Sequence, residues 1–298
     1  MSFKTLGQLG IPILLVCVWG FPANAHVDQG ISEKPDILLI AVDDLNDWVG
    51  CLGGHPQVQT PNIDRLAKAG VLFTNAHCQA PVCNPSRSSL MSSKYPSTSG
   101  IYFLNPDLES SDKIQRDQLM PHRFQAEGYQ VTAAGKLFHA NQNAKYLPNY
   151  AGSFGGFGPF PKEKLGPFSD HKLWDWGPFP DDSRQTPDWK IADWAIQQIQ
   201  KEDQKPSWLG VGFYRPHVPQ YAPQAWFDMY PLSTVELPQQ VWNDLEDIPP
   251  YGIDITRLEH IAPTAKWVAD HDQQKPLVQS YLAVSALSML KLEGSWTR

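Results

Sequence analysis

Two adjacent acidic residues, Asp43 and Asp44, follow directly after the continuous apolar run Ile37–Val42. Such a short run rich in β-branched residues is typical of a strand that is covered on both faces. Two carboxylates at a strand end repel each other unless a cation lies between them, and their hard oxygens suit Ca²⁺ or Mg²⁺. A solvated turn or a helix cap is the ordinary alternative. The pair is therefore a candidate metal site.

A cysteine stands at the head of the segment Cys83-Asn84-Pro85-Ser86-Arg87. The residues from Ser86 onward predict a helix, and the amino end of a helix presents partial positive charge to an anion. A buried structural cysteine before a helix is the more common occurrence. From its residues alone, the segment predicts such a cysteine before a helix.

Three more polar side chains, Lys136, His139 and His217, follow closely after predicted strands. Taken singly, each suits a surface lysine or a loop histidine. In parallel α/β sheets, however, ligands bind beyond the carboxyl ends of the strands. We expect Lys136 and His217 to meet Asp43 and Asp44 at that edge of the sheet.

The elements that must position these side chains alternate along the chain. The patterns predict helices over 60–70, 86–91, 121–127 and from 188 onward, and strands over 37–42, 71–73, 129–134 and 208–213. The stretch 141–187 is dense in Gly, Pro, Phe and Trp and predicts a long ordered loop region. Alternating strands and helices indicate an α/β fold with a mostly parallel sheet.

The bulk composition excludes some functions. The chain has 298 residues, and its formal net charge of -7 argues against a nucleic-acid partner. Residues 1–25 predict a signal peptide that ends in Ala23-Asn24-Ala25, with an apolar run too short for a stable membrane span. We therefore expect export to a periplasmic, secreted or lysosome-like compartment. The exported chain would contain three cysteines, Cys51, Cys78 and Cys83. A disulfide between Cys51 and Cys78 is possible, but the sequence does not decide it.

The Cys-x-Pro-Ser-Arg segment resembles the signature of the formylglycine-dependent sulfatases. The Gly135-Lys136-x-x-His139 segment is similar to a second segment of that family. Arg215-Pro216-His217-Val218-Pro219 is similar to a third, found in the iduronate 2-sulfatase-like subgroup. The resemblance runs from about residue 34 to about residue 282. It implies an alkaline-phosphatase-like three-layer α/β/α sandwich, truncated at the C-terminus, in which 33–298 is an incomplete N-terminal catalytic domain.

The resemblance also implies site roles. A formylglycine-generating enzyme would convert Cys83 to formylglycine, whose hydrated aldehyde attacks sulfur. Asp43, Asp44 and residue 83 would hold Ca²⁺, with Mg²⁺ as the alternative. The catalytic residues would be Cys83, Arg87, Lys136, His139 and His217. The implied substrate is a sulfated glycosaminoglycan or another sulfated polysaccharide. Trp174, Trp176 and Trp189 would either stack on its sugar rings or belong to the core.

One family segment, Asp-His-Gly, does not occur in the chain. Asp270-His271-Asp272 lies before the last predicted helix and follows no buried strand, so it is not expected to replace that segment. Two carboxylates and one further oxygen fall short of the about six to eight oxygens that Ca²⁺ takes. We therefore expect weak activity or none from this chain. Two alternatives stay open: a non-catalytic remnant that binds sulfated glycans, and a phosphatase or phosphodiesterase of the same superfamily.

Overall fold

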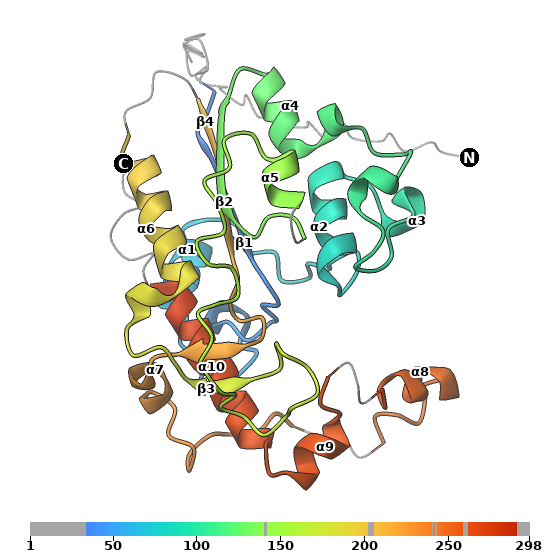
Figure 1. Cartoon of the computed structure of the whole chain (residues 1–298), viewed down its shortest axis with the longest axis vertical. Helices are drawn as coiled ribbons and strands as arrows, with labels where there is room; N and C mark the ends of the chain where they lie inside the picture. The colour runs from blue at the N-terminus through green and yellow to red at the C-terminus, as the bar shows by residue number, and fades with distance from the viewer. Residues whose placement is uncertain are drawn as a thin grey trace, which may run out of the picture. The chain divides into compact units, whose positions relative to one another are not determined.

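The computed structural model describes residues 34–139, 142–201, 206–239, 241, 243–258 and 262–290, with side chains up to residue 287 (Figure 1). The chain divides into two compact units, Met1–Lys34 and Pro35–Arg298, and every described element belongs to the second. The predicted signal peptide at 1–25 lies outside the described residues. Within the described part of the chain, no helix has the length and apolar character needed to cross a membrane.

Three parallel strands form the central sheet, in the order β1-β4-β2. They are β1 (Ile37–Val42), β4 (Ser207–Phe213) and β2 (Gln130–Gly135). Both outer strands pair with β4 over their whole length, so their carboxyl ends lie level with its end. The parallel sheet predicted from the sequence is confirmed, and the residues that follow these strands meet at one edge.

Side chains alternate between the two faces of the sheet, and helices cover both (Figure 1). Leu38, Ile40 and Val42 pack on the face covered by α6 (Pro187–Ile199). Ile37, Leu39 and Ala41 face the opposite core, which is closed by the helices α2 (Cys83–Ser92), α4 (Met120–Ala126) and α5 (Gln142–Tyr146). This is the expected three-layer α/β/α arrangement.

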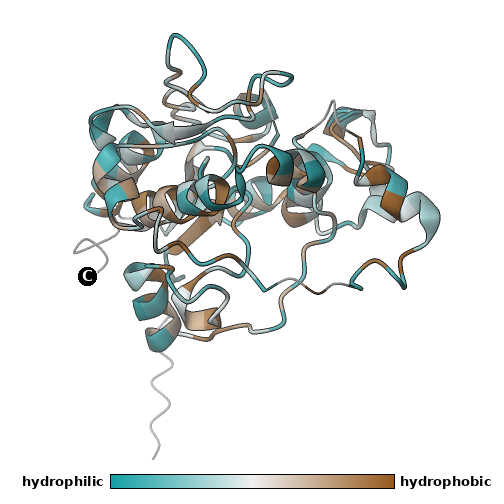
Figure 2. Cartoon of the chain, turned by 90° about the horizontal axis from the view of Figure 1, so that it is seen from below, coloured by the Kyte–Doolittle hydropathy of each residue, from teal (hydrophilic) through white to brown (hydrophobic). Residues whose placement is uncertain are grey.

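A second small sheet pairs β3 (Trp176–Pro178) in parallel with β5 (Gln220–Ala222). The helix α10 (Gln274–Leu290) packs on β5 and on α7 (Gln224–Asp228), and its residues 282–287 are buried. Figure 2 shows that hydrophobic and hydrophilic residues alternate along many of the helices, as expected when part of each helix packs on a core. This packing matters for the site because α10 reaches the loop that follows β1.

The remaining helices and turns are short and lie between the elements named above in the sequence. They are α1 (Pro61–Ala69), α3 (Pro96–Ser99), α8 (Pro250–Ile255) and α9 (Ala265–Asp270), with 3-10 turns at Gly50–Leu52, Leu108–Ser110, Arg116–Gln118 and Ser183–Gln185. The described part of the predicted long loop, 142–187, contains α5, β3 and the 3-10 turn at Ser183–Gln185.

The predicted strand at 71–73 is wrong. Val71 is 81% exposed and Phe73 is 75% exposed, and no described strand pairs with this segment. β-Branched and aromatic residues favour a strand only where a neighbouring strand accepts the backbone hydrogen bonds. Here no described neighbour supplies them.

The helix α2 begins three residues earlier than predicted, at Cys83 instead of Ser86. Val82 is extended and precedes the first turn. Pro85 fits within that turn because its missing N–H would have no partner in the helix. The consequence is that Cys83 is the first helical residue and lies at the positive end of the helix.

The start of α6 also differs from the prediction. Its N-cap is Thr186, whose hydroxyl accepts a hydrogen bond from Trp189 N at 3.4 Å. Asp188, where the helix was predicted to begin, is buried and accepts hydrogen bonds from the backbone N–H groups of Tyr214 and Arg215, each at 2.8 Å. It therefore fixes the loop after β4 instead of capping the helix.

A glycine in β4 lets the turn after β2 approach the sheet. Lys136 N donates to Gly212 O at 2.8 Å, and a Cβ placed on Gly212 would lie 2.2 Å from Lys136 O. Gly135, just before, has a φ of +74°, which only glycine adopts without strain. These two glycines bring the Lys136 backbone against β4.

We expect Gly212→Ala to lower the free energy of unfolding by about 1–3 kcal/mol, because backbone atoms would have to move to admit the methyl group. Urea unfolding followed by circular dichroism measures this. Gly70→Ala is the control, since its Cβ would lie 3.4 Å from the nearest atom. Equal unfolding midpoints for the two variants would show that the close approach is not required.

Candidate active site

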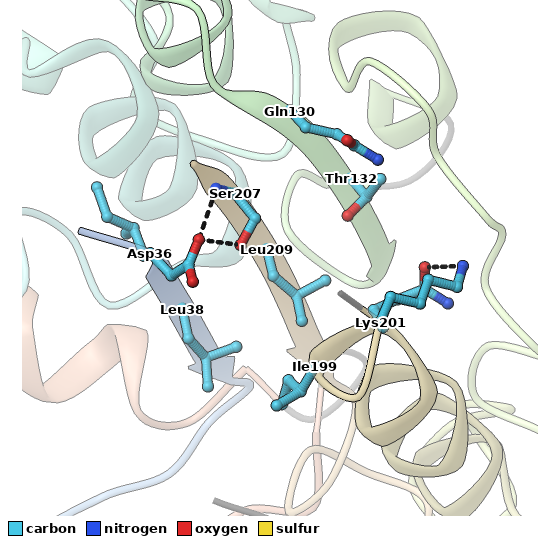
Figure 3. A pocket seen from close by; sticks show the side chains of 10 residues that line it. Asp36, Leu38, Gln130, Thr132, Ile199, Lys201, Ser207 and Leu209 are labelled. Atoms are coloured by element: carbon cyan, nitrogen blue, oxygen red, sulfur yellow. Dashed lines mark hydrogen bonds between the residues drawn. The ribbon is translucent and has the colours of Figure 1, made fainter. Parts of the chain in front are cut away.

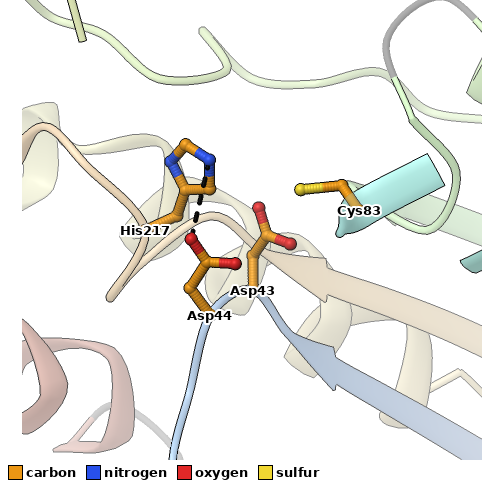
Figure 4. Close-up of side chains that lie close together, drawn as sticks. All are labelled: Asp43, Asp44, Cys83 and His217. Carbon is orange, nitrogen blue, oxygen red and sulfur yellow. Dashed lines mark ion pairs between the residues drawn. The ribbon is translucent and has the colours of Figure 1, made fainter. Parts of the chain in front are cut away.

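Four side chains that could bind a metal converge at the carboxyl edge of the sheet. Asp43, Asp44, Cys83 and His217 each place one ligand atom within 4.8 Å of the others (Figure 4). The two carboxylates follow β1, the thiol starts α2, and the imidazole follows β4. The structure thus brings together residues that lie up to 174 positions apart in the sequence (217 minus 43).

Backbone hydrogen bonds extend the β1–β4 pairing into the site. Asp43 N donates to Phe213 O at 3.2 Å, and His217 N donates to Asp43 O at 3.1 Å. Asp44 has a φ of 59°, a left-handed conformation that an aspartate tolerates better than most residues. The chain therefore turns sharply between the two carboxylates, and Asp43 is buried while Asp44 is exposed.

Asp43 is held by two buried cations. Its Oδ1 accepts from Arg87 Nη2 at 2.7 Å, and its Oδ2 accepts from Lys136 Nζ. Burial alone would raise the pKa of this carboxyl, but Arg87 and Lys136 together hold the pKa below its ordinary value. Arg87 also donates to the Lys136 carbonyl, which ties α2 to the turn after β2.

The contribution of Asp43 to stability should depend on pH. Because its folded pKa lies below the ordinary value of 3.8, the stabilisation is present above about pH 4 and is lost as the pH falls below that. We expect the difference in unfolding free energy between the natural protein and Asp43→Asn to shrink from pH 6 to pH 3, in buffer with a chelator. Asp112→Asn is the control, because Asp112 pairs with Lys113 on an exposed surface. A difference that stays constant over this range would contradict the assignment.

The Cys83 thiol faces the same ammonium group. Its Sγ lies 3.4 Å from Lys136 Nζ, and the residue is half-buried. Burial raises the pKa of the thiol, Lys136 opposes that shift, and Asp43 and Asp44 add to it. The unmodified thiol is therefore protonated at neutral pH and is a poor nucleophile as it stands.

The two histidines of the prediction lie differently. The His217 side chain is 15% exposed; its Nε2 is 3.7 Å from Asp44 Oδ2, and its Nδ1 bonds to Val218 O. The His139 ring is half-buried, and its Nδ1 is buried without a hydrogen-bond partner among the described atoms. Burial and the nearby Lys136 lower the pKa of both imidazoles, so both are neutral near pH 7.

Phe157 is a member of the site that sequence reasoning missed. Its ring centroid lies 4.7 Å from Lys136 Nζ and 4.7 Å from the His217 ring, and Arg215 Nη2 donates to its carbonyl at 2.9 Å. The Gly- and Phe-rich composition of 152–158 indicated an ordered loop, but it could not single out one ring. The Phe157 ring therefore contacts both Lys136 and His217.

Tyr281 on α10 was also missed. Its hydroxyl donates to Asp44 O at 2.9 Å or to Asn46 Oδ1 at 3.0 Å, and accepts from Asn46 N at 2.9 Å. Its ring also meets Trp48 edge-on at 5.4 Å. The sequence holds no signal for this contact, since a tyrosine on an apolar helix normally belongs to the core. Tyr281 fixes the loop that carries Asp44.

Other predicted or alternative residues lie outside the cluster. Asp270 pairs with Lys266, and His271 stacks on Trp267 at 4.1 Å, so neither belongs to the metal-binding group. Of the three tryptophans predicted either to stack on sugar rings or to belong to the core, Trp176 is buried and donates a hydrogen bond to Gln273, which supports a core role. Trp174 and Trp189 are half-buried. Cys51, Cys78 and Cys83 carry free thiols, so the possible disulfide between Cys51 and Cys78 is not formed.

A separate cavity of about 230 Å³ opens at the amino ends of the three strands (Figure 3). There Asp36 Oδ1 accepts from Ser207 N at 2.7 Å and from Ser207 Oγ at 2.8 Å. Gln130, Thr132 and Lys201 also line it. Because it lies at the opposite ends of the strands from Asp43 and Lys136, it takes no part in the candidate active site.

The donor set fits a divalent cation. Asp43 and Asp44 supply the hard oxygens that Ca²⁺ and Mg²⁺ prefer, while the thiol and imidazole are softer donors. Both oxygens of Asp43 already accept hydrogen bonds from cationic groups. A metal ion at this site would therefore share that carboxylate with Arg87 or Lys136.

Comparison with known proteins agrees with this geometry. The sulfatase family model matches residues 35–283. The chain belongs to the sulfatase family. The matched range contains all the residues of the candidate active site, including the thiol at position 83 and the imidazole at position 217.

Among curated relatives, a sulfatase of Formosa agariphila is 40% identical over 271 residues, which are 84% of this chain and 52% of the relative. The iduronate 2-sulfatase of Mus musculus is 30% identical over 301 residues, covering 93% of this chain and 53% of the relative. The chain thus spans about half the length of these two sulfatases.

Among solved structures, the phosphonate monoester hydrolase of Agrobacterium radiobacter aligns with a TM-score of 0.64 at 17% identity. The alignment covers 87% of this chain and 58% of that one. At this identity the match bears on the fold alone. It agrees with the α/β/α sandwich expected for a sulfatase.

Proposed function

We propose that the chain provides the catalytic centre of a sulfuric ester hydrolase that acts on sulfated carbohydrates. The observation that carries the proposal is the position of Cys83 at the start of α2, with its Sγ 3.4 Å from Lys136 Nζ and within 4.8 Å of ligand atoms of Asp43, Asp44 and His217. Membership of the sulfatase family supports the same reaction.

Each residue has a proposed task. The Lys136 ammonium, beside residue 83, binds an oxygen of the sulfate group and offsets its charge. Arg87 holds Asp43 and the Lys136 backbone in place. His217, whose Nε2 faces Asp44, is the proposed contact for the sulfate group and, in its protonated form, the proposed acid that donates a proton to the leaving alcohol. His139, whose Nδ1 has no hydrogen-bond partner among the described residues, is the proposed acceptor of a proton from the group at position 83.

Two groups that the family uses would complete the site. Formylglycine made from Cys83 would supply a hydrated aldehyde as the nucleophile toward sulfur. A divalent cation held by Asp43, Asp44 and the oxygen at position 83 supplies Lewis acidity, and we propose Ca²⁺, with Mg²⁺ as the alternative. The protonated thiol described above is a poor nucleophile, which is in keeping with a need for conversion.

The proposed substrate is a sulfated glycosaminoglycan or a related polysaccharide. The name of the mouse relative, iduronate 2-sulfatase, supports a sulfated sugar. We further propose that a signal peptide at 1–25 directs export and is then removed, and that a formylglycine-generating enzyme acts on the Cys83 segment. The proposed catalytic domain extends from residue 33 onward.

The test is to co-express the full chain with a formylglycine-generating enzyme and to measure release of 4-nitrophenol from 4-nitrophenyl sulfate with added CaCl₂. Mass spectrometry of the peptide that contains residue 83 reports its conversion. We expect at most weak turnover, which depends on conversion and disappears in Cys83→Ser. Complete conversion without turnover of this ester or of sulfated disaccharides would reject hydrolysis by this chain and would favour a glycan-binding role. Turnover of 4-nitrophenyl phosphate retained in Cys83→Ser would favour the phosphatase alternative.

A further inference from the structure

Three consecutive large apolar side chains are exposed on one loop. Tyr102 is 53% exposed, Phe103 is 73% exposed and Leu104 is 47% exposed. Scattered apolar residues on a surface need no explanation, but a contiguous group marks an interaction site more often. We call residues 102–104 the aromatic loop.

The aromatic loop is fastened beside Cys83 by the next residue in the chain. The Asn84 side chain is fully buried, and its Nδ2 donates to the carbonyl oxygens of Phe103 at 3.0 Å, Leu104 at 3.1 Å and Pro106 at 2.9 Å. Its Oδ1 accepts from Gln142 Nε2 at 3.3 Å. Through these hydrogen bonds the buried amide of Asn84 holds the aromatic loop against the first turn of α2.

Both ends of the aromatic loop are anchored in the core. Ile101, just before it, is fully buried, and Leu108, shortly after it, is 2% exposed; both belong to the core that covers one face of the sheet. The backbone is therefore fixed on both sides and in the middle, while the side chains of 102–104 point outward enough to remain exposed. A rigid backbone that presents aromatic rings loses little entropy when a ligand binds.

We propose that the aromatic loop is the platform on which a pyranose ring of a sulfated carbohydrate stacks, next to the sulfate ester at residue 83. This inference rests on the proposed function. The ester itself needs cations, which Arg87 and Lys136 supply inside the site. The adjoining sugar instead offers apolar C–H faces, and flat aromatic side chains beside the nucleophile suit those faces. Phe103 and Tyr102 are thus specificity-determining residues for the carbohydrate.

The experiment is affinity electrophoresis of the full chain in native gels that contain dissolved heparin or ulvan. Phe103→Ala is expected to weaken binding to at least one of these polysaccharides about tenfold, the loss typical of a contact that contributes strongly to binding. Phe103→Tyr should restore binding, since it keeps the ring. Phe73→Ala is the matched control: Phe73 is 75% exposed, but no hydrogen bond is known to tie it to Asn84. It should bind as the natural protein does.

The outcomes separate this inference from the proposed hydrolysis. Equal binding by Phe103→Ala, Phe73→Ala and the natural protein overturns the platform, whatever the turnover of 4-nitrophenyl sulfate. Loss of binding in Phe103→Ala alone supports it, even if no ester is hydrolysed. A change of oligomeric state in gel filtration, with binding unchanged, would make the loop a protein contact and also overturns the inference. If Phe103→Ala loses its folded circular dichroism spectrum, Tyr102→Ala decides in the same way.

Discussion

Lys136→Met is expected to reduce kcat/KM for 4-nitrophenyl sulfate at least about 100-fold while raising the affinity for Ca²⁺ about tenfold. The first effect follows because the variant lacks the ammonium group beside residue 83. That group would stabilise the negative charge of the transition state. The second follows because the ammonium occupies Asp43 Oδ2, where it repels a divalent ion and competes with it for that oxygen. Arg87 still pairs with Asp43 and still donates to the backbone carbonyl of residue 136, so the fold should be retained.

Calorimetric titration with CaCl₂ measures the second effect without any need for turnover. Lys113→Met is the control, because Lys113 pairs with Asp112 on the surface and its side chain is 58% exposed. A lower Ca²⁺ affinity in Lys136→Met would show that the lysine organises the carboxylates for the metal instead of competing with it. MgCl₂ titrations of the same proteins distinguish the two proposed ions.

Arg87→Met is expected to cost about 3–5 kcal/mol of unfolding free energy, because it leaves the Asp43 carboxylate buried with only one cation and removes a bond to the Lys136 carbonyl. Urea unfolding measures the loss. The control is Arg184→Met, which breaks an ion pair of nearly the same length, 2.6 Å to Asp182, on an arginine whose side chain is 75% exposed. Exposed pairs contribute little, so no measurable change is expected there.

If the two arginine variants lost the same amount, burial would not be what makes the Asp43 pair important. If Arg87→Met were as stable as the natural protein, water molecules would have taken the place of the guanidinium beside the Asp43 carboxylate. Either result would remove the stated reason for an arginine at this position.

The parts of the fold that could be predicted are those set by local pattern. The run Ile37–Val42 is a strand as predicted, because an apolar run followed abruptly by two aspartates has few other solutions. The edge of the sheet where Lys136 and His217 meet the aspartates could also be predicted, since parallel strands end together. The chemical types of these residues pointed to the site before any coordinates did.

The parts that could not be predicted depend on distant contacts. The helix start at Cys83, the fastening of the aromatic loop by Asn84, and the rings of Phe157 and Tyr281 all rest on partners that no sequence pattern links to them. The strand predicted at 71–73 failed for the same reason, because pairing depends on a neighbour and not on the residues alone. The roles of the individual site residues stay predictions until the variants are measured.

The bond between Tyr281 and the loop after β1 has a consequence for the order of assembly. It joins Asp44 to a residue 237 positions later in the chain. During synthesis, which proceeds from the amino end, the two carboxylates emerge early, yet the side chain that fixes their loop emerges only after β4, as part of α10. Closing so large a loop is slow compared with forming a helix. Asp43 and Asp44, the first residues of the candidate active site to be synthesised, are therefore among the last to reach their final position.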